Sequence, residues 1–291
     1  MSKSYYSLGL MSGTSMDGVD ASVIQTDGKS KYKAILDKYF EYPQVIYKQL
    51  TKLRDKIKSS KDLRKFSKEI KNVEKEITLF HAKAVNQILK KTKVNVNFIG
   101  FHGQTIYHNA KERISKQLGD GKLLSKITKK TVVYDFRQND LKNGGEGAPL
   151  TPIFHQMLQK RFNIKPVSFF NIGGILNRTT IWKDGLLSAR DLGPGMCLID
   201  KWIRTKTNKK YDKNGDIAKT GKVNKDVLDK YWNVFQLSDQ ERISYDISDF
   251  DISFAKKLSL KDGAATLTPV SYTHLRAHET DSYLVCRLLL E

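Results

Sequence analysis

A short run of glycines, hydroxyls and one carboxylate near the N-terminus carries the residue types that bind a phosphate chain. The segment 13–18, Gly-Thr-Ser-Met-Asp-Gly, lies between two apolar runs, 5–11 and 19–26, which predict the strands of a hairpin. Glycine lets a backbone approach a phosphate closely, and hydroxyls and amides donate to its oxygens. The carboxylate would repel a bare phosphate but suits one that carries a metal ion. An ordinary Gly/Asp hairpin turn would explain the same residues equally well.

A second glycine turn follows a later strand. The apolar run 167–170 leads into Asn171-Ile172-Gly173-Gly174, where glycines again allow a ligand to approach the backbone. A lone Gly-Gly pair is weak evidence by itself. Two such turns, in a chain without a dinucleotide-binding fingerprint, together predict a nucleotide held between two β-hairpins.

Asp191 is the candidate general base. It follows a hairpin predicted over 179–190 and precedes Gly193-Pro194-Gly195. A carboxylate at a strand end can take a proton if its pKa stays low enough for it to be ionised. The glycine turn leads into an amphipathic segment, 196–203, whose N-terminal end could face an anion. The rival interpretation is that Asp191 only caps that helix.

Four polar residues lie just after two other predicted strands, 94–101 and 131–136. The four residues are His102, Gln104, Arg137 and Asp140. Each alone could be a satisfied structural residue. Together they match a hydroxylated sugar that carries a carboxylate, because an arginine binds a carboxylate through two parallel hydrogen bonds.

Strands that alternate with helices must position these motifs. The segment 43–93 is predicted helical, because its apolar residues recur in steps of three and four from Leu63 to Ile88. Such a stripe packs on a sheet more often than it forms a coiled coil. A further helix is predicted over 152–162. This alternation indicates an α/β fold, in which ligands gather at the carboxyl ends of strands.

Composition excludes several classes of protein. The 291 residues are 39% hydrophobic, which supports a packed core and excludes wholesale disorder. No run reaches the ~18 apolar residues of a membrane span, and no signal-peptide pattern opens the chain, so we expect a cytoplasmic protein. Cys197 and Cys286 are too few for a disulfide framework. The net charge of +20 comes mostly from dispersed lysines, which favours a solvated surface over a nucleic-acid site.

The order of these motifs resembles that of the anhydro-N-acetylmuramic acid kinases. The resemblance extends over residues 5–268. It rests on the segments 9–20, 100–105, 117–121, 135–140, 144–150, 171–175, 191–195 and 211–212. It implies an actin-like ATPase (ribonuclease H-like) fold of two α/β domains, residues 1–165 and 166–268, the second of them incomplete.

The resemblance also implies an activity and its residues. Members of the family hydrolyse the 1,6-anhydro ring of their amino sugar and phosphorylate O6, which gives N-acetylmuramic acid 6-phosphate in peptidoglycan recycling. ATP and Mg²⁺ are the implied cofactors, Asp191 the implied catalytic base, and a homodimer the implied assembly. The implied sugar ligands are His102, Gln104, Arg137 and Asp140. The implied ATP ligands are Gly13, Thr14, Ser15, Met16, Asp17, Gly18, Val19, Asp20, Asn171, Gly173 and Gly174.

Departures from the family pattern leave alternatives open. Leu192 and Met196 replace the Thr and Asn that usually flank Gly-Pro-Gly, so a related sugar kinase with another substrate is one alternative. No lysine follows Lys261, and no further glycine-rich adenosine motif follows 264–268. Residues 269–291 are therefore expected to be a non-native tail, and an inactive truncated form is a second alternative. A basic nucleic-acid binder without catalysis is the hypothesis from another class of protein.

Overall fold

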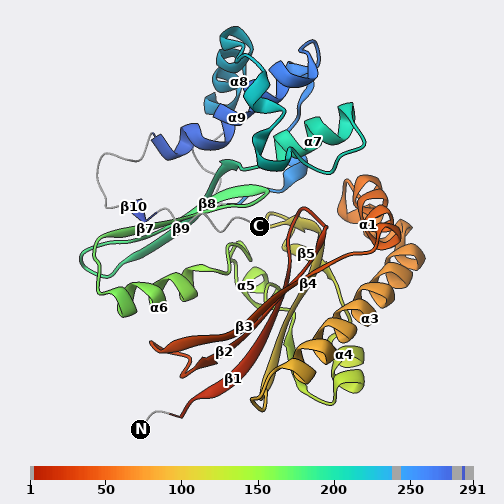
Figure 1. Cartoon of the computed structure of the whole chain (residues 1–291), viewed down its shortest axis with the longest axis vertical. Coiled ribbons are helices and arrows are strands. Elements are labelled where there is room, and N and C mark those ends of the chain that lie inside the picture. Colours follow the sequence, from red (N-terminus) through yellow and green to blue (C-terminus); the bar gives the residue numbers. More distant parts are fainter. Residues whose placement is uncertain (1–2, 238–243, 277–283, 286–291) are drawn as a thin grey trace. The chain divides into compact units, whose positions relative to one another are not determined.

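The chain divides into two units, each with its own sheet and helices. The computed structural model describes residues 3–237, 244–276 and 284–285 (Figure 1). Unit 1 consists of residues 1–148 with 160–162, and unit 2 of residues 149–159 with 163–291. The mixed sheets and their helices confirm the predicted α/β class. The boundary after residue 165 and the tail from residue 269 stay predictions.

The sheet of unit 1 is an antiparallel meander extended by parallel strands. Its first three strands pair in sequence, β4 lies parallel to β1, β6 parallel to β4, and β5 pairs antiparallel with the second half of β4. This arrangement is that of a ribonuclease H-like sheet. The strands are β1 (Tyr5–Ser12), β2 (Gly18–Thr26), β3 (Tyr32–Glu41), β4 (Phe98–Asn109), β5 (Ile114–Leu118) and β6 (Thr131–Tyr134).

The segment predicted as one helix over 43–93 forms three. They are α1 (Gln44–Lys56), α2 (Ser60–Lys65) and α3 (Ser67–Lys91). The break between α1 and α2 falls where α2 is capped: the N–H and the hydroxyl of Ser59 both donate to Oδ2 of Asp62. The buried stripe of α3 lies against the sheet, as predicted. Two further helices in this unit are α4 (Gly121–Thr128) and α5 (Gln138–Lys142).

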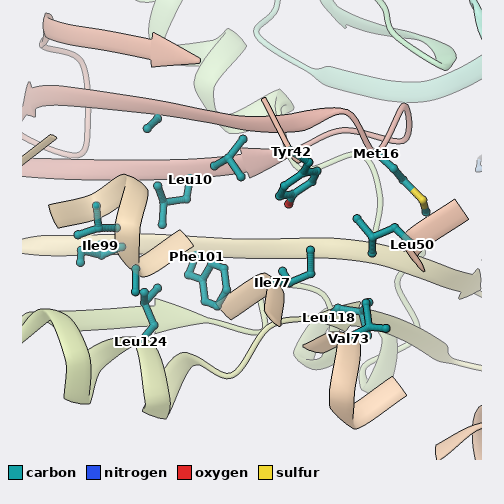
Figure 2. Close-up of a cluster of buried hydrophobic side chains, with 14 of the residues drawn as sticks. Leu10, Met16, Tyr42, Leu50, Val73, Ile77, Ile99, Phe101, Leu118 and Leu124 are labelled. Atoms are coloured by element: carbon teal, nitrogen blue, oxygen red, sulfur yellow. The ribbon is translucent and has the colours of Figure 1, made fainter. Parts of the chain in front are cut away.

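The core of unit 1 reaches from the sheet to the turn between β1 and β2. Figure 2 shows Leu10 and Phe101 from the sheet packed with Ile77 of α3. Met16, within the turn, is 1% exposed and belongs to the same cluster. Burial of a large side chain stabilises a fold by about 1.5–3 kcal/mol, so Met16 ties the turn to the core.

The sheet of unit 2 contains a second antiparallel meander of three strands. Strands β7 (Val167–Ile172), β8 (Ile175–Ile181) and β9 (Leu187–Pro194) pair antiparallel in sequence, and β10 (Leu284–Val285) lies parallel to β7. In both units a glycine turn joins the first two strands. Helix α6 (Pro152–Phe162) has the bounds that the sequence predicts.

Helices after β9 form the second core, around the fully buried Trp202. The helices are α7 (Cys197–Lys206), α8 (Lys225–Leu237) and α9 (Leu260–Arg276), with short 3-10 turns η1 (Lys213–Gly215), η2 (Ala218–Thr220), η3 (Ile247–Asp249) and η4 (Ser253–Ala255). Helix α9 continues through Pro269, and Val270 is fully buried. Cys286 and His278 lie outside the described residues. In the described part of the chain, no helix is long and apolar enough to cross a membrane.

Two predicted strand ends are wrong. β4 does not end at Phe101 but continues through His102 and Gln104, because β5 pairs with its second half. Gly103, with φ of +74°, lies where the register of β4 shifts, a conformation that favours glycine. In the same way β9 continues through Asp191 to Pro194, with a bulge that leaves Leu192 without an opposite residue.

The buried His81 predicts a loss of stability in acid. Burial lowers the pKa of this side chain to about 4, below its ordinary value of about 6.5 in an unfolded chain. The unfolded state therefore binds more protons as the pH falls from 6.5 to 4, and His81 alone contributes about 2 kcal/mol to the stability lost between pH 7 and 5. Urea unfolding at both pH values should show a loss in the parent chain that exceeds the loss in His81→Gln by about this amount. Equal losses would contradict it.

Candidate active site

In the turn between β1 and β2, two backbone carbonyls accept hydrogen bonds from other groups of unit 1. The Gly13 carbonyl accepts from Nε2 of Gln104 at 2.8 Å and from the N–H of Met16 at 3.2 Å. The Asp17 carbonyl accepts from the N–H of Tyr42 at 2.7 Å. Gln104, predicted as a sugar ligand, is fully buried and supports this turn instead of lying on an open surface.

Two backbone N–H groups and one hydroxyl of the same turn have no hydrogen-bond acceptor among the described residues. Nη1 of Arg54 lies 3.4 Å from the Thr14 carbonyl, whereas the N–H groups of Thr14 and Ser15 meet no acceptor among the described residues. The Thr14 hydroxyl likewise has no partner in the described part of the chain, while the Ser15 hydroxyl donates to Oδ1 of Asp17 at 2.5 Å. Successive N–H groups of this kind form an anion-binding concavity. The turn therefore presents two backbone N–H groups and one hydroxyl that could donate to an anion.

Other predicted ATP ligands in this segment serve the turn through backbone or packing. Met16 and Val19 are buried in the core, so only their backbone could reach a nucleotide. Gly18 has no room for a side chain, because a Cβ there would overlap the Phe40 carbonyl and the Tyr39 ring. The side chains of Met16 and Val19 and the missing side chain of Gly18 therefore determine the shape of the turn and leave only backbone atoms to contact a ligand.

Two carboxylates beside the turn suit a cation that is held mainly by phosphates. Burial raises the pKa of Asp20, and the negative charge of Asp17 raises it further. Mg²⁺ in such sites keeps several waters and binds one or two carboxylates together with substrate phosphates. Among the described residues no group of three or more His, Cys, Asp or Glu could hold a metal ion alone. Asp17 and Asp20 therefore fit Mg²⁺ only as partners of a bound phosphate chain.

The glycine turn of unit 2 follows the same plan. The Gly173 carbonyl accepts from the N–H of Met196 at 2.8 Å, and the Gly174 carbonyl accepts from Gly195 at 3.0 Å and Cys197 at 3.3 Å. The N–H of Gly174 meets no acceptor among the residues that the structure describes. The N–H groups at the start of α7 thus donate to the carbonyls of the turn, and the N–H of Gly174 is left able to donate to a ligand.

Asp191 lies at a bulge of β9, with its carboxylate anchored by backbone. Its side chain is 5% exposed, and Oδ2 accepts from the N–H of Tyr245 at 2.9 Å. It does not cap α7, whose N-cap is Met196, so the rival interpretation is wrong. Strand register places Asn171, Asn177 and Asp191 in one row across the three strands. The proposed base therefore shares a sheet face with a predicted nucleotide ligand.

A connected polar cluster in unit 1 joins three of the four predicted sugar ligands. Nε and Nη2 of Arg137 lie 3.1 and 2.8 Å from Nε2 of His102, and Nη1 donates to the Gly147 carbonyl at 2.5 Å. Asp140 accepts from the N–H of Gly147 at 2.7 Å, and its own carbonyl accepts from Gly145. The glycine-rich loop after α5 is held by these contacts, and Gln104 is not part of them.

His102 is a neutral acceptor in this cluster. Burial, and after it the positive charge of Arg137, lower the pKa of His102 to about 4. Nδ1 lies 2.7 Å from the Gly103 carbonyl and must carry the proton, because a carbonyl only accepts. Nε2 is then an acceptor toward the guanidinium. Near pH 7 His102 orients Arg137 and holds no proton to donate at Nε2.

The two departures from the family pattern lie in different surroundings. Leu192 is 5% exposed and packs with Phe170 and Leu176 in a small apolar cluster. Met196 is 41% exposed and bonds the Gly173 carbonyl through its backbone. The side chain of Leu192 is thus accommodated by apolar packing, and the role of Met196 in the turn uses no side-chain atom.

Sequence reasoning missed four polar residues beside these sites. Asn177 has a buried Oδ1 with no hydrogen-bond partner in the described part of the chain, although it lies opposite Asp191 in the strand register. Ser12, Tyr42 and His81 form a buried polar group beneath the first turn. The signal for Asn177 was its position, six residues after Asn171 on the returning strand of the hairpin. The contacts of the other three join residues up to 69 positions apart.

Comparisons with known proteins show the family to which the chain belongs. A family model described as anhydro-N-acetylmuramic acid kinase matches residues 5–244. The curated enzyme of that name from Pelagibacter ubique is 54% identical over 92% of this chain and 72% of its own length. Those from Agrobacterium fabrum and Rhizobium etli are 40% and 36% identical, over 90% and 96% of this chain and 72% and 78% of theirs. The chain belongs to the anhydro-N-acetylmuramic acid kinase family.

Proposed function

We propose that this chain uses ATP to open the 1,6-anhydro ring of anhydro-N-acetylmuramic acid and to phosphorylate O6, which yields N-acetylmuramic acid 6-phosphate for peptidoglycan recycling in the cytoplasm. The observation that carries the proposal is the shared construction of the two glycine turns. In each, the carbonyls are bound by protein donors and backbone N–H groups remain for phosphate oxygens. The relatives described above are named anhydro-N-acetylmuramic acid kinases, and the comparisons favour no alternative.

Asp191 takes a proton from water in the first step. The water oxygen forms a bond to the anomeric carbon, the bond from that carbon to O6 breaks, and O6 keeps the electron pair. A general base of this kind contributes about 10²–10⁴ in rate. The N–H of Tyr245 donates to Oδ2 of Asp191 and holds the carboxylate of the base in place.

The released O6 attacks the γ-phosphorus of ATP in the second step, and the bond to the β-phosphate oxygen breaks as ADP leaves. Positioning and charge neutralisation carry most of the rate in such transfers. In unit 1 the amides of Thr14 and Ser15, and in unit 2 the amide of Gly174, are the proposed donors to phosphate oxygens. When bound beside Asp17 and Asp20, Mg²⁺ would neutralise phosphate charge.

The polar cluster around Arg137 is proposed to recognise the sugar. The guanidinium supplies the positive charge that the sugar's carboxylate requires, and His102 fixes its plane through Nε2. Asp140 and Gly147 hold the adjoining loop. Homodimer formation, implied by the resemblance, stays a prediction.

The product distinguishes this reaction from ordinary sugar phosphorylation. The chain is incubated with the anhydro sugar and Mg-ATP, and the product is analysed by mass spectrometry. A product heavier than the substrate by one water and one phosphoryl group is expected. Open-ring amino sugars and hexoses serve as comparison substrates. Phosphorylation of an open hexose in preference to the anhydro sugar, or ATP turnover without a sugar product, would contradict the proposal.

Asn177 is expected to accept a second hydrogen bond from the attacking water. Water has two protons, and the one not taken by Asp191 can be accepted by the buried Oδ1 of Asn177, which lacks a partner in the described part of the chain. Asn177→Ala is expected to lower kcat about tenfold or more and leave the Kd for ATP unchanged. Thr180→Val, on the same strand but the other face, is the matched control. An unchanged kcat in Asn177→Ala would contradict this role.

A further inference from the structure

A buried chain of hydrogen bonds lies directly beneath the first glycine turn. Oγ of Ser12, the last residue of β1, lies 2.9 Å from the hydroxyl of Tyr42 and 3.1 Å from Nε2 of His81. Nδ1 of His81 lies 2.8 Å from the carbonyl of Ile77. All three polar side chains are nearly or fully buried. They come from β1, from the segment between β3 and α1, and from α3.

The direction of every hydrogen bond in this chain is determined. The Ile77 carbonyl can only accept, so Nδ1 of His81 carries the proton and Nε2 is an acceptor. The Ser12 hydroxyl therefore donates to Nε2, and its oxygen accepts from Tyr42. Burial lowers the pKa of His81 to about 4 and raises that of Tyr42, so near pH 7 the imidazole stays neutral and the phenol keeps its proton.

Tyr42 holds both ends of the turn. Its hydroxyl binds Ser12, which precedes the turn, and its backbone N–H binds the carbonyl of Asp17 at 2.7 Å, where the turn ends. The Tyr42 ring lies in the same buried cluster as Met16 and Leu10 (Figure 2). The span between the two ends is thereby fixed from inside the core.

The hydroxyls in and beside the turn consequently differ in their hydrogen-bond partners. The Ser12 proton is committed to His81, and the Ser15 hydroxyl donates to Asp17. Only the Thr14 hydroxyl, of these three, has no partner among the described residues. We propose that the Ser12–Tyr42–His81 chain positions the phosphate turn, with Ser12 as an internal anchor and Thr14 as the hydroxyl that meets the nucleotide phosphate. This inference rests on the proposed function.

Binding measurements on single variants test this assignment. The Kd values for Mg-ATP and for the anhydro sugar are measured by calorimetry, with the urea midpoint of each variant. Ser12→Ala, Tyr42→Phe and His81→Gln are each expected to raise the Kd for Mg-ATP by about 5- to 50-fold and to leave that for the sugar within about twofold. Tyr42→Phe removes one oxygen from the side chain and retains the backbone bond to Asp17.

Thr78 of α3 provides the matched control. Its buried hydroxyl donates to the Glu74 carbonyl and accepts from the N–H of Asp120, so it supports a different loop. Thr78→Val should lose comparable stability and bind Mg-ATP like the parent chain. In the double variant of Ser12→Ala with His81→Gln, the loss of affinity should be smaller than the two single losses combined, because both break one chain.

Four results would overturn the inference. Weak Mg-ATP binding in Ser12→Ala alone, with normal binding in Tyr42→Phe and His81→Gln, would make Ser12 a direct phosphate ligand. An equal loss of affinity in Thr78→Val would make the effect a general loosening of the unit. Normal binding in all three network variants would remove the positioning role while leaving the proposed function intact. Failure of the parent chain itself to bind Mg-ATP would instead overturn the proposed function, and this inference with it.

Discussion

Replacement of Asp191 by asparagine is expected to lower kcat by about 10²–10⁴ and to leave the Kd for ATP and for the sugar near their parent values. Asparagine has almost the same shape, and its Oδ1 can still accept from the N–H of Tyr245. The amide cannot take a proton from water, however, so the first bond to the anomeric carbon forms without a base. The measurement is the initial rate of formation of the sugar phosphate.

Asp184→Asn provides the control for this experiment. Asp184 lies in the loop between β8 and β9 of the same unit, where its carboxylate accepts from the N–H of Leu186 on an exposed surface. That variant should keep the parent rate. If Asp191→Asn also kept the parent rate, or if it lost ATP binding in proportion to its rate, Asp191 would not be the base.

Local sequence patterns predict the parts of this fold that depend on neighbouring residues. The hairpin of β1 and β2 follows from two apolar runs around a glycine turn, and the buried stripe of α3 follows from its spacing. β3 is not predicted, because residues such as Lys33, Asp37 and Lys38 alternate poorly with its apolar residues on a half-exposed edge strand. Tertiary pairing with β2 overrides its weak pattern.

Local sequence patterns predict only part of the candidate site as well. Residue types identify both glycine turns and Asp191, because their chemistry is local. Gln104 is predicted as a sugar ligand from its place after a strand, but its contact with Gly13 joins residues 91 positions apart. No local pattern reports which of two faces a polar side chain takes after a bulge such as that at Gly103. The contact by which Gln104 supports the turn is therefore visible only in the folded unit, and its assignment as a sugar ligand stays a prediction.

Gly195→Ala is expected to destabilise unit 2 by about 2–3 kcal/mol and to lower kinase activity at least tenfold. A Cβ at this position would overlap the carbonyl oxygen of Gly173 and press on Ile175. The backbone on both sides is fixed: the N–H of Gly195 binds the Gly174 carbonyl, and its own carbonyl accepts from the buried hydroxyl of Ser271. The added methyl group can be accommodated only if the segment 193–195 moves away from the Gly173-Gly174 turn within unit 2, which displaces the Gly174 amide. Urea unfolding and the initial kinase rate measure the two effects.

Gly173→Ala separates this steric effect from the loss of a glycine as such. A Cβ there would meet nothing nearer than 3.8 Å, and the backbone of Gly173 does not lie in the left-handed region. The free energy of unfolding of the Gly173→Ala variant should stay within about 0.5 kcal/mol of that of the parent chain. Because the new methyl group would lie on the turn that is proposed to face phosphate, a rise in the Kd for Mg-ATP without a change in stability is expected. Equal destabilisation by both variants would show that the turn does not tolerate any side chain, and that the close contact between Gly195 and Gly173 does not determine its position.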